Sequence, residues 1–261
     1  MYRKRIGVVV VFLAVILSGC AAKNTESSVP TELIVSAAVS LTDSMNEIQS
    51  LYEKEHGDIK LVFNFGSSGA LQQQIEQGAP SDLFLSAGKK QMKALVDKQL
   101  VEESRQTGLL LNELVIVVST DMQGAVSSVA DLAKPQFGKL AIGEPDTVPA
   151  GSYAKESLEF YKLWDQLQSK LVYAKDVRQV LTYVETGNAD VGFVYKTDAM
   201  TSKKVKVASI IDPSSHKSIE YPMGIVKATK HLQEAQDFYD FLRGAEAREI
   251  FAKYGFTVPK Q

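Results

Sequence analysis

Apolar and polar positions follow one another in short blocks along most of this chain, and each block predicts a strand followed by a helix. The segment 63–75 shows this best, because apolar positions alternate up to Phe65, a small hydroxyl-rich turn follows at 66–69, and Leu71 and Ile75 are four residues apart. Such a turn leaves the first N–H groups of a helix unpaired. Together with the serine hydroxyls, these groups suit an anion.

A second unit of the same design precedes this one. Residues 33–39 predict a short strand, and Ser40 with Asp43 three positions later fits a capping box at a helix start. A serine there can simply cap its own helix. Parallel strands nevertheless place their carboxyl ends on one side of a sheet, so Ser40 and Ser68 can also face one ligand.

The alternation of strands and helices continues and predicts an α/β protein with a mostly parallel sheet. The apolar stretch 109–118, interrupted at Asn112, is either a crossover strand between two lobes or a buried strand of one lobe. A new series of predicted strands and helices follows it, and residues 220–226 predict a strand with which the chain returns toward the first lobe. This order favours two lobes that the chain crosses twice.

The later half contains three more candidates for an anion site. The turn 149–151 exposes helix-start N–H groups, and Ala150 offers only its backbone. Asp176 is predicted to be an N-cap, which makes Val177 the first helical residue with a free N–H. Tyr195 ends a strand and is either a core tyrosine, which its position alone favours, or a hydroxyl donor at a cleft.

The N-terminus predicts export. Basic residues at 3–5 precede an apolar run over 6–17, which is too short for a comfortable membrane span. The small residues Leu-Ser-Gly before Cys20 resemble the bacterial lipobox, in which the signal is cut before the cysteine and the cysteine carries lipid. We therefore expect a signal peptide over 1–19 and a flexible tether over 20–30. Cys20 is the single cysteine, so no disulfide framework is possible.

Composition and charge limit the kinds of ligand. The chain has 261 residues, 45% apolar and 23% charged, which is typical of one large or two small globular domains. Removing the first nineteen residues takes three of its 29 basic residues and leaves 26 against 31 acidic ones, a net charge of about −5. This argues against nucleic acid as a partner. No Cys/His/Asp/Glu cluster predicts a metal cation site, and no cofactor is expected.

An enzyme is the main alternative. The sequence Gly66–Ala70 is one residue short of the Gly-x-Ser-x-Gly nucleophile elbow, and it follows a predicted strand. A serine hydrolase would need a histidine partner, but His56, His216 and His231 all lie in polar surroundings typical of surface loops or helix ends. The sequence therefore favours binding over catalysis.

Several segments together resemble one family, the molybdate-binding proteins of bacterial ABC importers. The matching segments span nearly the whole mature chain; they are Ala37–Thr42, Phe65–Gly69, Gln74–Phe84, Val148–Ala154, Asp176–Arg178, Val191–Tyr195 and Tyr254–Phe256.

The resemblance implies a two-lobed periplasmic-binding-protein fold of type II with two crossovers. We expect 31–111 and 225–261 to form lobe 1 and 112–224 to form lobe 2. It further implies a non-enzymatic, monomeric lipoprotein outside the cell, anchored to the membrane through Cys20. Such a protein binds molybdate or tungstate and delivers it to the permease subunits of an importer. Sulfate or phosphate stays open as an alternative ligand.

In that family two serines, two backbone amides and a tyrosine hydroxyl hold the oxyanion. By position these are Ser40, Ser68, Ala150, Val177 and Tyr195. Molybdenum enters only as the bound oxyanion, with no direct protein ligand. The family often has a third serine or threonine where this chain has Gly69, which leaves the choice between Ser67 and Ser68 open. We expect Arg178, beside the site, to form a salt bridge rather than to contact the ligand.

Overall fold

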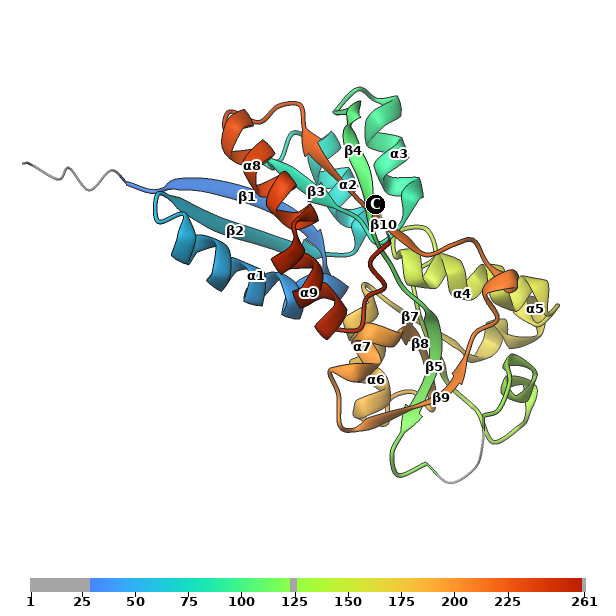
Figure 1. Cartoon of the computed structure of the whole chain (residues 1–261). Coiled ribbons are helices and arrows are strands. Elements are labelled where there is room, and N and C mark those ends of the chain that lie inside the picture. Colours follow the sequence, from blue (N-terminus) through green and yellow to red (C-terminus); the bar gives the residue numbers. More distant parts are fainter. Residues whose placement is uncertain (1–28, 123–125, 260–261) are drawn as a thin grey trace, which may run out of the picture.

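The chain folds into two lobes, each built around a five-stranded sheet (Figure 1). The computed structural model describes residues 29–122 and 126–259. The expected signal peptide, Cys20 and most of the expected tether lie outside these residues. None of the described helices is long and apolar enough to cross a membrane.

The first lobe contains the sheet of strand order β2-β1-β3-β10-β4. Its strands are β1 (Thr31–Ala38), β2 (Ile59–Gly66), β3 (Leu83–Leu85), β4 (Val101–Leu111) and β10 (Glu220–Val226). Five helices accompany them: α1 (Thr42–Glu55), α2 (Ser68–Glu76), α3 (Lys89–Asp97), α8 (Leu232–Arg243) and α9 (Ala245–Lys253). Helices α2 and α3 pack together on the sheet, and α9 packs against α1 and α8.

The second lobe contains the sheet of strand order β7-β6-β8-β5-β9. Its strands are β5 (Leu114–Ser119), β6 (Leu140–Gly143), β7 (Leu171–Ala174), β8 (Val191–Tyr195) and β9 (Val205–Ile210). Its helices are α4 (Pro149–Phe160), α5 (Trp164–Leu167), α6 (Val177–Glu185) and α7 (Lys196–Met200). Short 3₁₀ helices complete the described structure: η1 (Val39–Leu41), η2 (Val129–Ala133), η3 (Gln168–Lys170) and η4 (Pro213–Ser215).

Both sheets are mostly parallel in strand direction, as the sequence predicted, but each contains one strand that runs against the other four and makes the sheet mixed. In the first sheet β1 pairs in parallel with β2 and β3, but β10 runs antiparallel to β3 and β4. In the second sheet β6 is parallel to β7 and β8, but β5 is antiparallel to β8 and β9. Strands β5 and β10 are the ones that enter a sheet from the other lobe, so they run against the βαβ strands already there.

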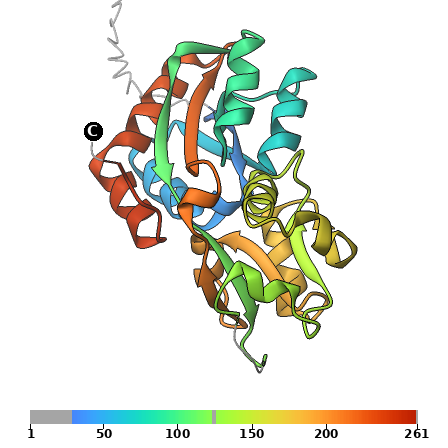
Figure 2. The ribbon, with the colours of Figure 1, turned by 90° about the vertical axis from the view of Figure 1, so that its right-hand side faces the viewer.

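The chain passes between the lobes twice, after β4 and after β9. Figure 2 shows the green strands β4 and β5 following one another from one lobe into the other, and the orange segment between β9 and β10 returning. Only Asn112 and Glu113 separate β4 from β5, so the apolar stretch 109–118 is a crossover. The expected boundary between residues 224 and 225 was wrong. It falls inside β10, whose residues from Glu220 onward pair with β4 in the first sheet.

Alternation along the strands divides the core. In β3, Leu83 and Leu85 point into the large apolar cluster, whereas Phe84 between them faces a smaller one beneath α2 and α3. The large cluster continues through both lobes. It includes Leu110 at the end of β4 and Leu114 at the start of β5, so the crossover is buried on its apolar side.

Candidate functional site

A small cavity lies between the lobes, where strand ends and helix starts of both converge. It is lined by Ala38, Val39, Ser40, Gly66, Ser67, Ser68, Ala87, Val148, Pro149, Ala150, Val177 and Tyr195. All five residues that the sequence singled out therefore meet at one place. None of these lining residues is charged. The volume of the cavity is about 10 Å³, which is room for about one water molecule.

The Ser40 hydroxyl is held by a polar network at the crossover. Its Oγ lies 3.0 Å from the hydroxyl of Tyr221 on β10, which also accepts a bond of 3.2 Å from Asn112 Nδ2. Asn112 Nδ2 also reaches Thr197 Oγ1 in the second lobe at 2.9 Å. Because Tyr221 accepts from Asn112, it can donate its own proton to Ser40, and the Ser40 proton is then free for a ligand.

The predicted capping box at Ser40 was wrong. No side chain caps η1 or α1, whose N-cap residues are Ala38 and Leu41. Ser40 turns to Tyr221 instead, and Asp43 bonds to Arg178 of the second lobe. Partners from distant parts of the chain have therefore replaced the local ones.

The first three N–H groups of α2, those of residues 68–70, differ in their hydrogen-bond acceptors. Ser67 is the N-cap, and its Oγ accepts a 3.4 Å bond from Ala70 N. Gly69 N donates across the cleft to Thr147 O at 2.9 Å. Ser68 N, the first amide of the helix, has no carbonyl within its own helix to bond. The Ser68 hydroxyl accepts from Ala87 N at 2.9 Å, so its proton can point into the cavity.

At two helix starts the second lobe contributes backbone N–H groups from residues whose side chains are apolar. Helix α4 begins at Pro149, and Ala150 is its second residue. Helix α6 begins at Val177, and its predicted N-cap is confirmed, because an Asp176 carboxylate oxygen accepts from Gln179 N at 2.8 Å. The amides of Ala150 and Val177 lie in the first turn and therefore lack intrahelical partners. Both side chains are buried, with exposed fractions of 0% and 3%.

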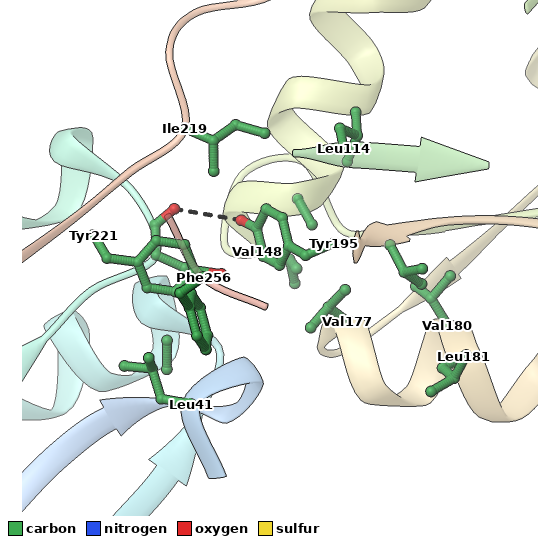
Figure 3. Close-up of a cluster of buried hydrophobic side chains, with 14 of the residues drawn as sticks. Leu41, Leu114, Val148, Val177, Val180, Leu181, Tyr195, Ile219, Tyr221 and Phe256 are labelled. Atoms are coloured by element: carbon green, nitrogen blue, oxygen red, sulfur yellow. Dashed lines mark hydrogen bonds between the residues drawn. The ribbon is translucent and has the colours of Figure 1, made fainter. Parts of the chain in front are cut away.

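Tyr195 closes the cavity from the second lobe and is almost fully buried. Its ring meets that of Tyr221 with centroids 5.7 Å apart, and Figure 3 shows the two tyrosines facing each other with Val177 nearby. The Tyr195 hydroxyl donates to Ala87 O at 3.3 Å, a long bond that leaves it able to turn. Burial raises the pKa of both hydroxyls well above 10, so each stays protonated at neutral pH.

An ion triad flanks the cavity without lining it. Arg178 Nε lies 2.6 Å from Asp198 Oδ1 in its own lobe, and Arg178 Nη2 lies 2.5 Å from Asp43 Oδ2 in the other. The expectation that Arg178 forms a salt bridge is confirmed. Burial raises the pKa of Asp198 to about 6, which Arg178 opposes. The triad ties α6, next to Val177, to the first lobe.

A larger groove of about 580 Å³ beside α3 is a weaker candidate. Three of its four lysines have acidic partners: Lys89 Nζ lies 2.7 Å from Glu220, Lys93 Nζ 2.6 Å from Asp97 and Lys217 Nζ 3.4 Å from Glu156. Because these exposed lysines are paired, the groove has little net charge to attract a ligand and few hydrogen-bond donors held in a fixed direction. No group of three or more His, Cys, Asp or Glu side chains in 29–122 and 126–259 is placed to bind a metal ion.

Sequence reasoning missed Tyr221, Asn112 and Ala87. Tyr221 was seen only as part of a returning strand, and no local pattern signals that it meets Ser40, 181 positions away. Asn112 carried one usable signal, because a polar residue interrupts an apolar stretch at the crossover. Ala87 acts through its backbone alone, which a side-chain pattern cannot indicate.

Comparison with known sequences matches residues 33–257 to the family described as bacterial extracellular solute-binding proteins. YvgL of Bacillus subtilis (strain 168), named as a candidate substrate-binding lipoprotein of an ABC transporter, is 49% identical over 93% of this chain and 94% of its own. The molybdate-binding protein ModA of Escherichia coli (strain K12) is 42% identical over 87% of this chain and 89% of its own.

Solved structures agree with these relatives. The periplasmic molybdate-binding protein of Azotobacter vinelandii superposes with a TM-score of 0.79 at 25% identity, covering 87% of this chain and all of that one. The sulfate-binding protein SubI of Mycobacterium tuberculosis H37Rv superposes with a TM-score of 0.75 at 16% identity, over 87% of this chain and 86% of that one, so it shares the fold alone. The chain therefore belongs to the bacterial extracellular solute-binding proteins, and within them to the ModA family.

Proposed function

We propose that this protein captures molybdate, and tungstate with it, between its two lobes and delivers the anion to the permease subunits of an ABC importer. The observation that carries the proposal is a cavity between the lobes whose mostly buried lining offers neutral hydrogen-bond donors from both lobes and no charged side chain. The proposed ligand-binding groups are the hydroxyls and amides of Ser40 and Ser68, the amides of Ala150 and Val177, and the Tyr195 hydroxyl.

Neutral donors can hold a dianion in a buried site. Burying an anion is costly unless each oxygen is hydrogen-bonded, and bonds to charged acceptors are the strong ones. A lining with free donors and few free acceptors disfavours a protonated phosphate, because its O–H would lack a partner. Sulfate is selected against only through its smaller size, since it cannot reach both walls at once.

Location and partners form a second part of the proposal. The similarity to YvgL, a lipoprotein by name, supports the lipid anchor that the sequence predicts at Cys20. We infer that the lipid holds the protein on the outer face of the cell membrane, near the permease that receives the anion. Labelling with a radioactive fatty acid tests this, and a Cys20→Ser variant that still carried label would contradict it.

Titration calorimetry of the purified protein with molybdate, tungstate, sulfate and phosphate tests the ligand. We expect micromolar or tighter binding of the first two anions and at least about hundredfold weaker binding of the others, a difference of about 2.7 kcal/mol. A clear preference for sulfate or phosphate would overturn the molybdate assignment while leaving the fold intact.

A further inference from the structure

The two serines that the first lobe presents to the cavity are held by different kinds of group. The Ser68 hydroxyl accepts a bond of 2.9 Å from the backbone N–H of Ala87. A backbone N–H can only donate, so the Ser68 proton is left for a ligand. Ser40 Oγ instead lies 3.0 Å from the hydroxyl of Tyr221, and either of these two groups could be the donor. The direction of this bond depends on what else Tyr221 contacts.

Asn112, at the crossover between β4 and β5, decides that direction. Its Oδ1 accepts a bond of 2.9 Å from the backbone N–H of Glu113, which fixes the end of the amide that carries the nitrogen. Nδ2 therefore faces Tyr221 Oη at 3.2 Å and Thr197 Oγ1 at 2.9 Å, and each of its two protons serves one acceptor. The orientation of this side chain is thus set by the main chain of the crossover.

The hydrogen bonds then run in one direction from the crossover to the cavity. Because Asn112 already donates to the Tyr221 oxygen, the single proton of Tyr221 is directed at Ser40. With Ser40 as the acceptor, both hydroxyl protons have an oxygen to bond, one in Ser40 and one in an anion bound in the cavity that Ser40 lines. Tyr221 is 1% exposed and Ser40 4%, so bulk water has little access to these bonds.

We propose that Tyr221 and Asn112 are specificity-determining residues, which hold the Ser40 hydroxyl as a donor and thereby select anions that carry no O–H. This inference rests on the proposed function and extends it to two residues outside the lining of the cavity. They position the Ser40 proton and do not contact the anion. A hydroxyl that is free to turn can accept from the O–H of a protonated anion, whereas a hydroxyl held as a donor opposes that O–H with its own.

Sulfate and phosphate form a matched pair of probes for this role. At about pH 8 both are tetrahedral dianions of similar size, but phosphate carries one O–H and sulfate carries none. The ratio of sulfate affinity to phosphate affinity therefore reports the direction of the hydrogen bonds, while charge, size and lobe closure affect both anions alike. Displacement calorimetry, in which each anion competes with bound molybdate, measures both affinities even when they are weak.

Tyr221→Phe removes the hydroxyl that directs Ser40 and keeps the ring. That ring packs edge-on against those of Tyr195 and Phe256, so the packing seen in Figure 3 is retained. The Ser40 hydroxyl is then free to turn. We expect molybdate to bind about threefold to tenfold more weakly, and the sulfate-to-phosphate ratio to fall by a similar factor.

Asn112→Asp reverses the direction of the bonds. It keeps the shape of the side chain but offers Tyr221 an acceptor in place of a donor, so Tyr221 turns its proton away from Ser40. Ser40 then donates to Tyr221 and presents a lone pair to the cavity. We expect a larger fall in the ratio than in Tyr221→Phe. The added negative charge weakens the binding of both dianions and cancels in the ratio.

Two controls separate this role from a general structural one. Thr197→Val removes the other acceptor of Asn112 Nδ2 and leaves the bonds from Asn112 to Ser40 in place, so the ratio should not change. Ser40→Ala completes a double-mutant cycle. If Tyr221 acts through Ser40, then Tyr221→Phe lowers the ratio in the wild type but not in Ser40→Ala.

The outcomes distinguish this inference from the proposed function. An unchanged ratio in both Tyr221→Phe and Asn112→Asp overturns the inference and leaves molybdate binding standing. An equal fall of the ratio with and without the Ser40 hydroxyl also overturns it, because Tyr221 then acts by packing. A wild type that prefers sulfate to molybdate refutes the proposed ligand, while the ratio in the variants still decides the inference. If the wild type binds none of these anions, both fail.

Discussion

The two walls of the cavity use different chemistry for the same task. The first lobe presents two serine hydroxyls, and each is fixed by a partner from another part of that lobe: Ser40 by Tyr221 and Ser68 by Ala87 N. The second lobe presents the amides of Ala150 and Val177, whose side chains are apolar, and adds one hydroxyl from Tyr195. Alanine substitution removes a serine hydroxyl but keeps a backbone amide. An alanine scan would therefore detect the donors of the first wall and miss most of those of the second.

The largest effect is expected from removing both hydroxyls of the first wall. In a Ser40→Ala, Ser68→Ala double variant, two charge-assisted hydrogen bonds are lost at about 1.5–3 kcal/mol each, so molybdate binding should weaken by a factor of about 10²–10⁴ in calorimetry. Ser67→Ala is the matched control. It removes a helix cap but leaves both proposed donors, so it should lower stability more than affinity. An effect of Ser67→Ala as large as that of the double variant would move the site to Ser67.

The backbone wall can be probed with proline at position 177. Val177 is the first residue of α6, where proline is well tolerated, and Asp176 before it is extended, with φ −159° and ψ 170°. Val177→Pro removes the N–H, whereas Val177→Ala keeps it and loses a similar amount of packing. We expect Val177→Pro to bind molybdate about tenfold to hundredfold more weakly than Val177→Ala. Equal affinities would show that this amide does not hold the anion, and the comparison between the walls would then fail.

The smallest effect is expected from the ion pair that joins the walls. Asp43→Asn keeps the size of the side chain and a hydrogen-bond acceptor but removes the charge that faces Arg178. The Asp43 side chain is 41% exposed and that of Arg178 25%, so the pair is worth at most about 1 kcal/mol and binding should weaken no more than about fivefold. The same difference should shrink when affinities are measured in high salt. A loss comparable to that of the double serine variant would mean that closure, rather than the donors, limits affinity.

Local patterns in the sequence predicted helix starts in both walls. The strand, turn and helix around Ser68 follow from alternation and helical spacing, and the cap at Asp176 follows from one residue type at a helix start. These features depend on neighbours in the chain. The turn before α4 likewise marked Ala150 as a helix-start amide, whereas the choice of Tyr195 as a donor came from the family resemblance.

Features that depend on distant partners were missed or misread. Ser40 and Asp43 fit a capping box, yet their partners Tyr221 and Arg178 come from far along the chain. The lobe boundary was misplaced because Glu220–Val226 has the same apolar pattern whichever sheet it joins. Strand β10 belongs to the first sheet because it pairs with β3 and β4. The apolar pattern along one strand does not indicate which strands will lie beside it.

The bonds that hold Ser40 and Ser68 to Tyr221 and Ala87 all lie within the first lobe, so they survive when the lobes separate. Under the proposed function, the donors of the first lobe would thus be in position before the anion binds, whereas the bond from Tyr195 to Ala87 O requires contact between the two lobes. If the protein binds molybdate as proposed, we expect two events, a bimolecular encounter with the first lobe followed by a unimolecular closing of the second. The association rate would then depend on the first lobe, and the dissociation rate on the contacts between the lobes.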